Sequence, residues 1–233
     1  MTPDDSRTPS AAPLSAQLLT ALEARGSSPA LIWYGQDGRT ELSGHVLANW
    51  LQKNVNFLRD ELFAQVGASL AVMMPPHWKR TVMQLSGWLL GMDTQVGNSA
   101  GGAAFAADAA VLATDSPALD GADEAEELVL LDPVSLALRF SGEVPPLAHD
   151  WLPAVRGHGD VLNEPVTQWS GPTQEVVASA ATGVTGPDSP LMLEDVSGAD
   201  AAAAIAQWLA GGYVIAPASA LSAADRAGEG VRD

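Results

Sequence analysis

The sequence predicts an α/β protein in which a doubly wound, mostly parallel sheet carries helices on both faces. Residues 67–98 contain a complete strand, helix and strand. Short apolar segments then alternate with amphipathic helical segments along the chain, which is typical of this class. A hydrophobic content of 47% with 17% charged residues describes a globular protein with a substantial core.

The unit at residues 67–98 is the best specified part of the chain. Residues 68–74 form a short apolar run, as expected for a strand buried on both faces of a parallel sheet. We expect the helix to begin at about Pro76, because proline suits a first helical turn, and to end at Gly91. A second apolar segment follows directly, so the unit predicts a right-handed parallel crossover.

The residues before this unit predict a leader, a helix, a hairpin and a longer helix. Residues 1–12 are polar and predict a flexible leader, and regularly spaced leucines predict a helix that ends near Gly26. Residues 31–42 predict two strands that turn at 35–38. Residues 44–63 then place their apolar side chains on one helical face.

The residues after this unit continue the alternation until it fails. Residues 99–110 are small and predict a loop with a weak helix, and 110–113 and 128–131 predict strands. The acidic run at 123–127 predicts a turn and a solvated helix. Residues 133–172 are rich in proline and glycine and predict a long irregular insertion, which is unusual inside a compact domain.

The last third of the chain resumes the pattern. We predict two more helices and two more strands, in the order 173–181, 191–193, 200–209 and 213–216. The whole of residues 13–217 is expected to form a single α/β domain. Residues 218–233 are polar and contain glycine, so they predict a flexible tail.

Charge and composition exclude several classes of partner. The chain has 28 acidic and 11 basic residues and a formal net charge of -17, which disfavours nucleic acid and anionic membrane surfaces. Between Thr81 and Asp225 the basic residues are Arg139 and Arg156, too few for a site that holds several phosphates. The absence of cysteine excludes disulfides and zinc-thiolate sites. No signal peptide or membrane span is recognised, so we expect a cytoplasmic protein.

Three motifs resemble a known enzyme family. They are R-T-E-L-S-G-x-V-L-A-N-W-L (Arg39 to Leu51), M-P-P-H-W (Met74 to Trp78) and W-L-L-G (Trp88 to Gly91), and A-D-A-A-V-L-A-T-D (Ala107 to Asp115) looks like the next element. Together they resemble the N-terminal domain of the adenylate-forming enzymes, the acyl-CoA synthetase or AMP-binding superfamily. More narrowly, the chain is similar to a small actinobacterial family of uncharacterised proteins that carry this part of the fold.

The phosphate-binding loop of that family is not found. The family cradles a triphosphate with S/T-S-G-T-T-G-x-P-K-G, in which small residues expose backbone amides and a lysine adds charge. The candidate loops at 141–143, 170–173 and 182–186 all lack the lysine. AMP or ATP is the ligand that the resemblance implies, but without this loop and the C-terminal catalytic lid we predict no cofactor and no acyl adenylation by the chain alone.

The corner that follows the strand at 68–74 is a candidate ligand site. His77 and Trp78 lie where a strand ends and a helix begins, which is where open α/β sheets bind ligands. Lys79 and Arg80 follow as a basic pair, and we expect the corner to hold an anion at the helix N-terminus. The alternative is that Trp78 covers the core while both cations are solvated.

The irregular segment contains a second group of polar side chains. His149, Asp150, His158 and Asp160 are residue types that bind divalent metals, although their spacing matches no established ligand motif. The alternative is that they form surface contacts or hydrogen bonds that hold the loop.

Two serines and two tryptophans of the same segment have further interpretations. Ser141 or Ser170 paired with a nearby histidine would make a hydrolase, but the G-x-S-x-G elbow is absent. Trp151 and Trp169 are expected to anchor the segment or to form a partner surface.

Three hypotheses for function follow. The first is a non-catalytic relative of acyl-CoA synthetase N-terminal domains, a pseudoenzyme that acts as a binding or assembly module with a protein partner or as a homodimer. The second is a partial enzyme that binds nucleotide or acyl-CoA and needs a second chain. The third is a metal-dependent hydrolase that uses the histidine-containing segment.

Overall fold

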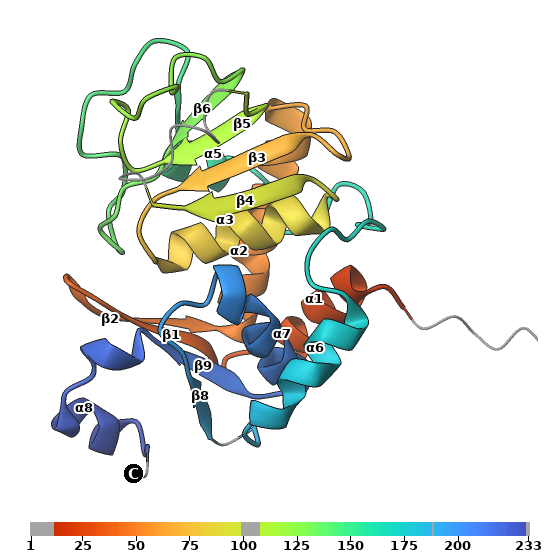
Figure 1. Cartoon of the computed structure of the whole chain (residues 1–233), viewed down its shortest axis with the longest axis vertical. Helices are drawn as coiled ribbons and strands as arrows, with labels where there is room; N and C mark the ends of the chain where they lie inside the picture. Colours follow the sequence, from red (N-terminus) through yellow and green to blue (C-terminus); the bar gives the residue numbers. More distant parts are fainter. Residues whose placement is uncertain (1–11, 99–107, 188, 232–233) are drawn as a thin grey trace, which may run out of the picture.

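The computed structural model describes residues 12–187 and 189–231 except 99–107, and it confirms the predicted α/β class (Figure 1). The strands divide between two sheets, which the sequence did not predict. One sheet has four strands in the order β2-β1-β9-β8, and the other has five in the order β4-β3-β5-β6-β7. Apart from the antiparallel β1–β2 hairpin, every neighbouring pair is parallel.

The strands lie close to the predicted positions. The four-stranded sheet contains β1 (Pro29–Gly35), β2 (Gly38–Ser43), β8 (Pro190–Met192) and β9 (Tyr213–Ala216). The five-stranded sheet contains β3 (Ser69–Met73), β4 (Asp93–Gly97), β5 (Val111–Thr114), β6 (Glu127–Leu130) and β7 (His149–Asp150).

The helices pack largely between the two sheets, as Figure 1 shows for α2 and α3. They are α1 (Leu14–Arg25), α2 (Gly44–Asn56), α3 (Trp78–Leu89), α5 (Trp151–Arg156), α6 (Gln174–Ala180), α7 (Ala201–Leu209) and α8 (Ala223–Gly228). A π-helix, η1 (Phe57–Glu61), extends α2. Within the described residues, no helix has both the length and the apolar composition that a membrane crossing requires.

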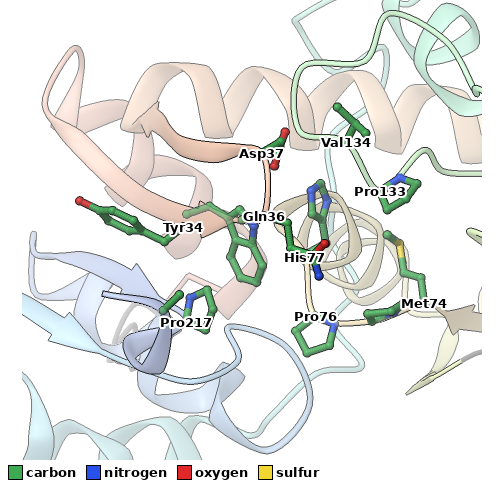
Figure 2. A pocket seen from close by; sticks show the side chains of 13 residues that line it. Tyr34, Gln36, Asp37, Met74, Pro76, His77, Pro133, Val134 and Pro217 are labelled. Atoms are coloured by element: carbon green, nitrogen blue, oxygen red, sulfur yellow. The ribbon is translucent and has the colours of Figure 1, made fainter. Parts of the chain in front are cut away.

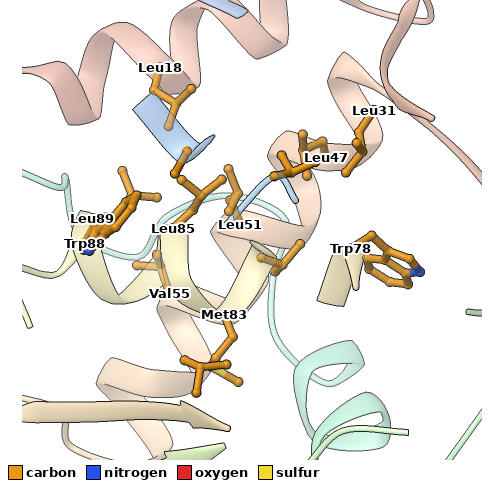
Figure 3. Packing of buried hydrophobic residues seen from close by; sticks show 14 of the residues in the cluster. Leu18, Leu31, Leu47, Leu51, Val55, Trp78, Met83, Leu85, Trp88 and Leu89 are labelled. Atoms are coloured by element: carbon orange, nitrogen blue, oxygen red, sulfur yellow. The ribbon is translucent and has the colours of Figure 1, made fainter. Parts of the chain in front are cut away.

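Helix α3 occupies the centre of the molecule, and all 12 of its residues are buried. It begins two residues after Pro76 because the side chain of His77 caps it, with Nδ1 accepting a hydrogen bond from the Lys79 amide at 3.2 Å. Leucines of α1 and α2 pack with α3 side chains in the main core (Figure 3). Burial on all sides means that the polar residues of α3 need partners inside the protein.

The predicted helix at 123–127 is wrong. The chain forms turns and bends up to residue 126 and enters β6 at Glu127, so the strand takes up the end of the predicted helix. Ala122 packs instead in a small apolar cluster with Ala71 and Leu112, on the face of the sheet turned away from the main core. The weak helix expected at 99–110 falls mostly outside the described residues.

Residues 218–231, which the sequence predicts as a flexible tail, contain a short 3₁₀ helix at Ala218–Ala220 and helix α8. Ser222 begins α8 with a capping box, and Leu221 is buried against the four-stranded sheet. Glu229 accepts hydrogen bonds from the Tyr34 hydroxyl at 2.7 Å and from Arg39 Nε at 2.6 Å. These contacts attach the segment to the β1–β2 hairpin.

Trp151 anchors the irregular segment, as predicted. Its ring is fully buried, stacks on Trp50 with 5.4 Å between centroids, and meets Trp78 edge-on at 6.1 Å. The indole N–H donates to Asn54 Oδ1 at 2.7 Å, so the polar edge of the ring is also satisfied. Trp169 packs edge-on against Trp88 at 5.9 Å.

We predict that Trp151→Ala lowers the free energy of unfolding by about 3–5 kcal/mol, because it opens a large cavity and leaves Oδ1 of the buried Asn54 without its donor. Trp169→Ala is the matched control, since Trp169 is only partly buried. Urea unfolding of both variants measures the difference. A loss for Trp151→Ala no greater than that for Trp169→Ala would contradict this assignment.

Candidate functional site

A cavity of about 590 Å³ opens where strands of both sheets end. Its walls come from four separate segments, which are the β1–β2 turn, the β3–α3 connection, the residues after β6 and the residues after β9 (Figure 2). Much of the lining is aromatic or apolar, including Trp33, Tyr34, Met74, Pro76, Pro133 and Pro217. The carboxyl ends of parallel strands are the usual ligand-binding edge of such sheets. The corner predicted at His77 therefore forms part of a real cavity.

Lys79 does not face this cavity. Its side chain is fully buried, and Nζ donates to the backbone carbonyls of Asp132 at 2.8 Å and Val134 at 2.7 Å. Burial lowers the pKa of Lys79 to about 8, and the nearby Asp132 carboxylate opposes this shift. The ammonium group therefore holds the segment that follows β6 against the start of α3.

The guanidinium of Arg80 also forms its hydrogen bonds within the protein. It donates to the Met74 carbonyl at 2.8 Å, to Ser197 Oγ at 2.7 Å and to the carboxylate of Asp195. Burial lowers the pKa of Arg80, and the Asp195 carboxylate opposes the shift. The alternative interpretation, in which both cations are solvated, is therefore wrong. Neither cation lines the cavity.

His77 is the one residue of the predicted corner that lines the cavity. Since Nδ1 accepts a hydrogen bond, the proton of the neutral ring lies on Nε2 and is directed to Ser135 Oγ at 3.3 Å. Ser135 donates its hydroxyl to Asp37 Oδ1 at 3.2 Å and its amide to Oδ2 at 2.6 Å. Burial and the charge of Lys79 lower the pKa of His77 to about 3. A ring protonated on Nε2 is not a base for Ser135, so this chain of bonds is structural.

The two histidines of the irregular segment contact carboxylates, and one of these, Glu61, lies near both rings. His149 Nε2 lies 3.0 Å from Glu127 Oε2, and His158 Nε2 lies 2.9 Å from Glu61 Oε2. Glu61 also lies 3.5 Å from His149 Nδ1. In the part of the chain that the structure describes, no group of three or more acidic and histidine side chains is placed to hold a metal ion.

The aspartates and serines predicted beside these histidines have other contacts. Asp150 accepts a backbone amide at 3.0 Å, while Asp160 is exposed. The Ser170 hydroxyl donates to a backbone carbonyl at 2.6 Å, and the Ser141 amide donates to Asp132 at 2.7 Å. The structure does not bring either serine into a hydrogen bond with a histidine.

The candidate phosphate loop at 170–173 is packed against the core. A β carbon on Gly171 would lie 2.7 Å from atoms of both Trp169 and Trp88, so the backbone is in close contact with two indole rings. The Ser170 amide donates to the Trp88 carbonyl at 3.2 Å, and Thr173 caps α6. Gly171 therefore allows the backbone to pack closely against the two indole rings.

Sequence reasoning missed Asp37 and Ser135. Asp37 lies in the predicted turn at 35–38, immediately after a strand, and that position was the available signal. Ser135 lies in the irregular insertion, where no local pattern indicates which residues return to the sheet edge.

The fold is that of the N-terminal part of acyl-CoA synthetases. The chain is similar to an acyl-CoA synthetase of Brucella canis (17% identity, TM-score 0.67), covering 85% of this chain and 42% of that one. It is also similar to the N-terminal domain of FACL13 from Mycobacterium tuberculosis (14% identity, TM-score 0.63), covering 88% of this chain and 56% of that one. The chain thus spans less than two thirds of each of these two solved structures.

One relative is matched over a larger share of its length than these solved structures. The chain is 29% identical over 191 residues to a Mycobacterium tuberculosis protein named "TIGR03089 family protein". The matched region covers 77% of this chain and 77% of that protein. That name states no activity. No profile of a known protein family matches the chain.

We predict that His77 contributes to the acid sensitivity of the fold. The pKa of His77 in the folded protein lies below the usual value of 6.5, so as pH falls the imidazole is protonated in the unfolded chain before it is protonated in the folded protein. The contribution of His77 to the free energy of unfolding is therefore fully present above pH 6.5 and is lost as pH falls towards 3. One proton contributes at most about 1.4 kcal/mol per pH unit. His77→Asn keeps a capping residue and should flatten this slope in urea unfolding between pH 7.5 and 4.5. Parallel curves for His77→Asn and the parent protein would refute the assignment.

We predict that Lys79→Met destabilises the protein, because the buried carbonyl of Asp132 and the partly buried carbonyl of Val134 lose their donor, at about 1–3 kcal/mol for the buried one. Arg156→Met, at an exposed cation, should change stability by less than about 0.5 kcal/mol. Thermal and urea unfolding compare the two. Equal midpoints for both variants would show that Lys79 is not a structural cation.

Proposed function

We propose that this chain is a non-catalytic binding module built on the fold of the N-terminal part of acyl-CoA synthetases, with the cavity at the strand ends as its ligand site. The observation that carries the proposal is the placement of Lys79 and Arg80. Both cations at the predicted anion site are buried and bonded to the protein.

Two further features support a function other than nucleotide chemistry. A triphosphate needs cations or exposed backbone amides, and no lysine or arginine is among the described residues that line the cavity. The loop at 170–173 uses its glycine to pack against tryptophan. Binding without chemistry is therefore the role that fits the cavity best.

Titration with magnesium ATP tests this proposal. We expect no saturable heat up to millimolar nucleotide, and no exchange of labelled pyrophosphate into ATP in the presence of acetate, decanoate or benzoate. The Brucella canis acyl-CoA synthetase, assayed under the same conditions, is the positive control. Saturable heat, or exchange above the background without protein, would overturn the proposal and favour a partial enzyme that a second chain completes.

A further inference from the structure

The charge around the cavity is negative on balance. Asp37 is the one ionised side chain among the described lining residues, because His77 is held neutral by its surroundings. The carboxylates of Asp132, Asp37 and Asp150 all act on the single buried ammonium of Lys79, in that order of strength. These three carboxylates outnumber the ammonium group that they act on, and the other cation of the corner, Arg80, is paired with Asp195, so the local balance of charge favours a cation.

Asp37 is held in place and keeps its charge available. Two hydrogen bonds from Ser135 fix its carboxylate, and each oxygen retains capacity for another donor. In the described part of the chain, no lysine or arginine side chain forms an ion pair with it. The residue is exposed at the tip of the β1–β2 turn, so a ligand can reach it from solvent.

Trp33 supplies a second polar group next to Asp37. Its side chain is 3% exposed, and the indole N–H has no hydrogen-bond partner among the described residues. A β carbon on Gly35 would lie 2.7 Å from Asp37 Oδ1 and 3.1 Å from Trp33 Nε1, so the acceptor and the donor flank one point of the cavity wall. An unpaired buried donor costs free energy that a ligand acceptor would recover.

The rest of the wall fits an apolar body. Trp33, Met74, Pro76 and Pro133 give the wall a largely apolar lining, and Figure 2 shows the last three of these around His77. A volume of about 590 Å³ is typical of small-molecule sites. The lining therefore combines an apolar body site with one acceptor and one donor.

We propose that the cavity binds a small organic cation, namely a protonated amine on an aromatic or aliphatic body that also carries an oxygen acceptor. The ammonium group bonds to the Asp37 carboxylate, the body packs against Trp33, Met74 and Pro76, and the oxygen accepts the indole N–H. This inference rests on the proposed binding function and names the ligand class of the same site.

The test compares three probes with the same methoxyphenyl body, titrated calorimetrically into the full chain at pH 7.5 and low salt. They are 4-methoxyphenethylamine, which is cationic, 2-(4-methoxyphenyl)ethanol, which is neutral, and 3-(4-methoxyphenyl)propionate, which is anionic. We expect the amine to bind about five- to tenfold more tightly than the alcohol, and the propionate to bind most weakly. Raising the salt concentration should reduce this preference.

Two variants assign the contacts. Asp37→Asn should bring the affinities of amine and alcohol together, whereas Glu41→Gln, which removes a charge from the same hairpin outside the cavity, should leave the preference intact. In ¹H–¹⁵N spectra, the amine should shift the indole N–H signal of Trp33, identified by its absence in Trp33→Phe.

Binding of the propionate as tight as that of the amine, an amine that does not bind, or an unchanged preference in Asp37→Asn would each overturn the inference. These failures are distinct from failure of the proposed function. If neither amine nor magnesium ATP binds, the cation inference fails while the non-catalytic assignment stands. If magnesium ATP binds, the non-catalytic assignment fails whatever the amine does.

Discussion

The arrangement of this protein depends on two cations buried at the start of α3. Removing a lysine and an arginine from water costs several kcal/mol each, and only a full set of hydrogen bonds offsets that cost. Lys79 obtains its bonds from the carbonyls at 132 and 134, and Arg80 obtains its bonds from Met74, Asp195 and Ser197. Segments from both sheets are thereby fixed to one helical turn.

The same bonds set the shape of the cavity. The residues after β6 form one wall, and Lys79 holds them from behind, while Asp37 reaches them from the opposite hairpin through Ser135. The ligand-binding edge that the fold provides is thus assembled from rigid pieces. In this molecule the positive charge of that edge stabilises the scaffold, and the open surface is left with aromatic rings and a carboxylate.

The parts predicted correctly from sequence are those with local signals. The unit from β3 to β4 was found within two residues, because prolines, a capping glycine and helical periodicity all lie inside it. The division into two sheets was not predicted, because β1 pairs with β9 and no local pattern encodes a partner so distant in sequence. His77 lies between β3 and α3, as its sequence position indicated, but the burial of Lys79 was missed, because it follows from α3 being enclosed on every side.

The long-range bonds of Arg80 also bear on how the chain folds during synthesis. Its bond to Ser197 joins residues 117 apart in sequence, and the indole of Trp208 closes onto the Ala30 carbonyl across 178 residues. The central strand–helix–strand unit makes local contacts and can form early, yet its arginine lacks Asp195 and Ser197 as partners until those residues have been synthesised. Until then water solvates the guanidinium and the β9 edge of β1 has no partner strand, so docking of the β8–β9 region completes both the pairing of β1 and the burial of this cation.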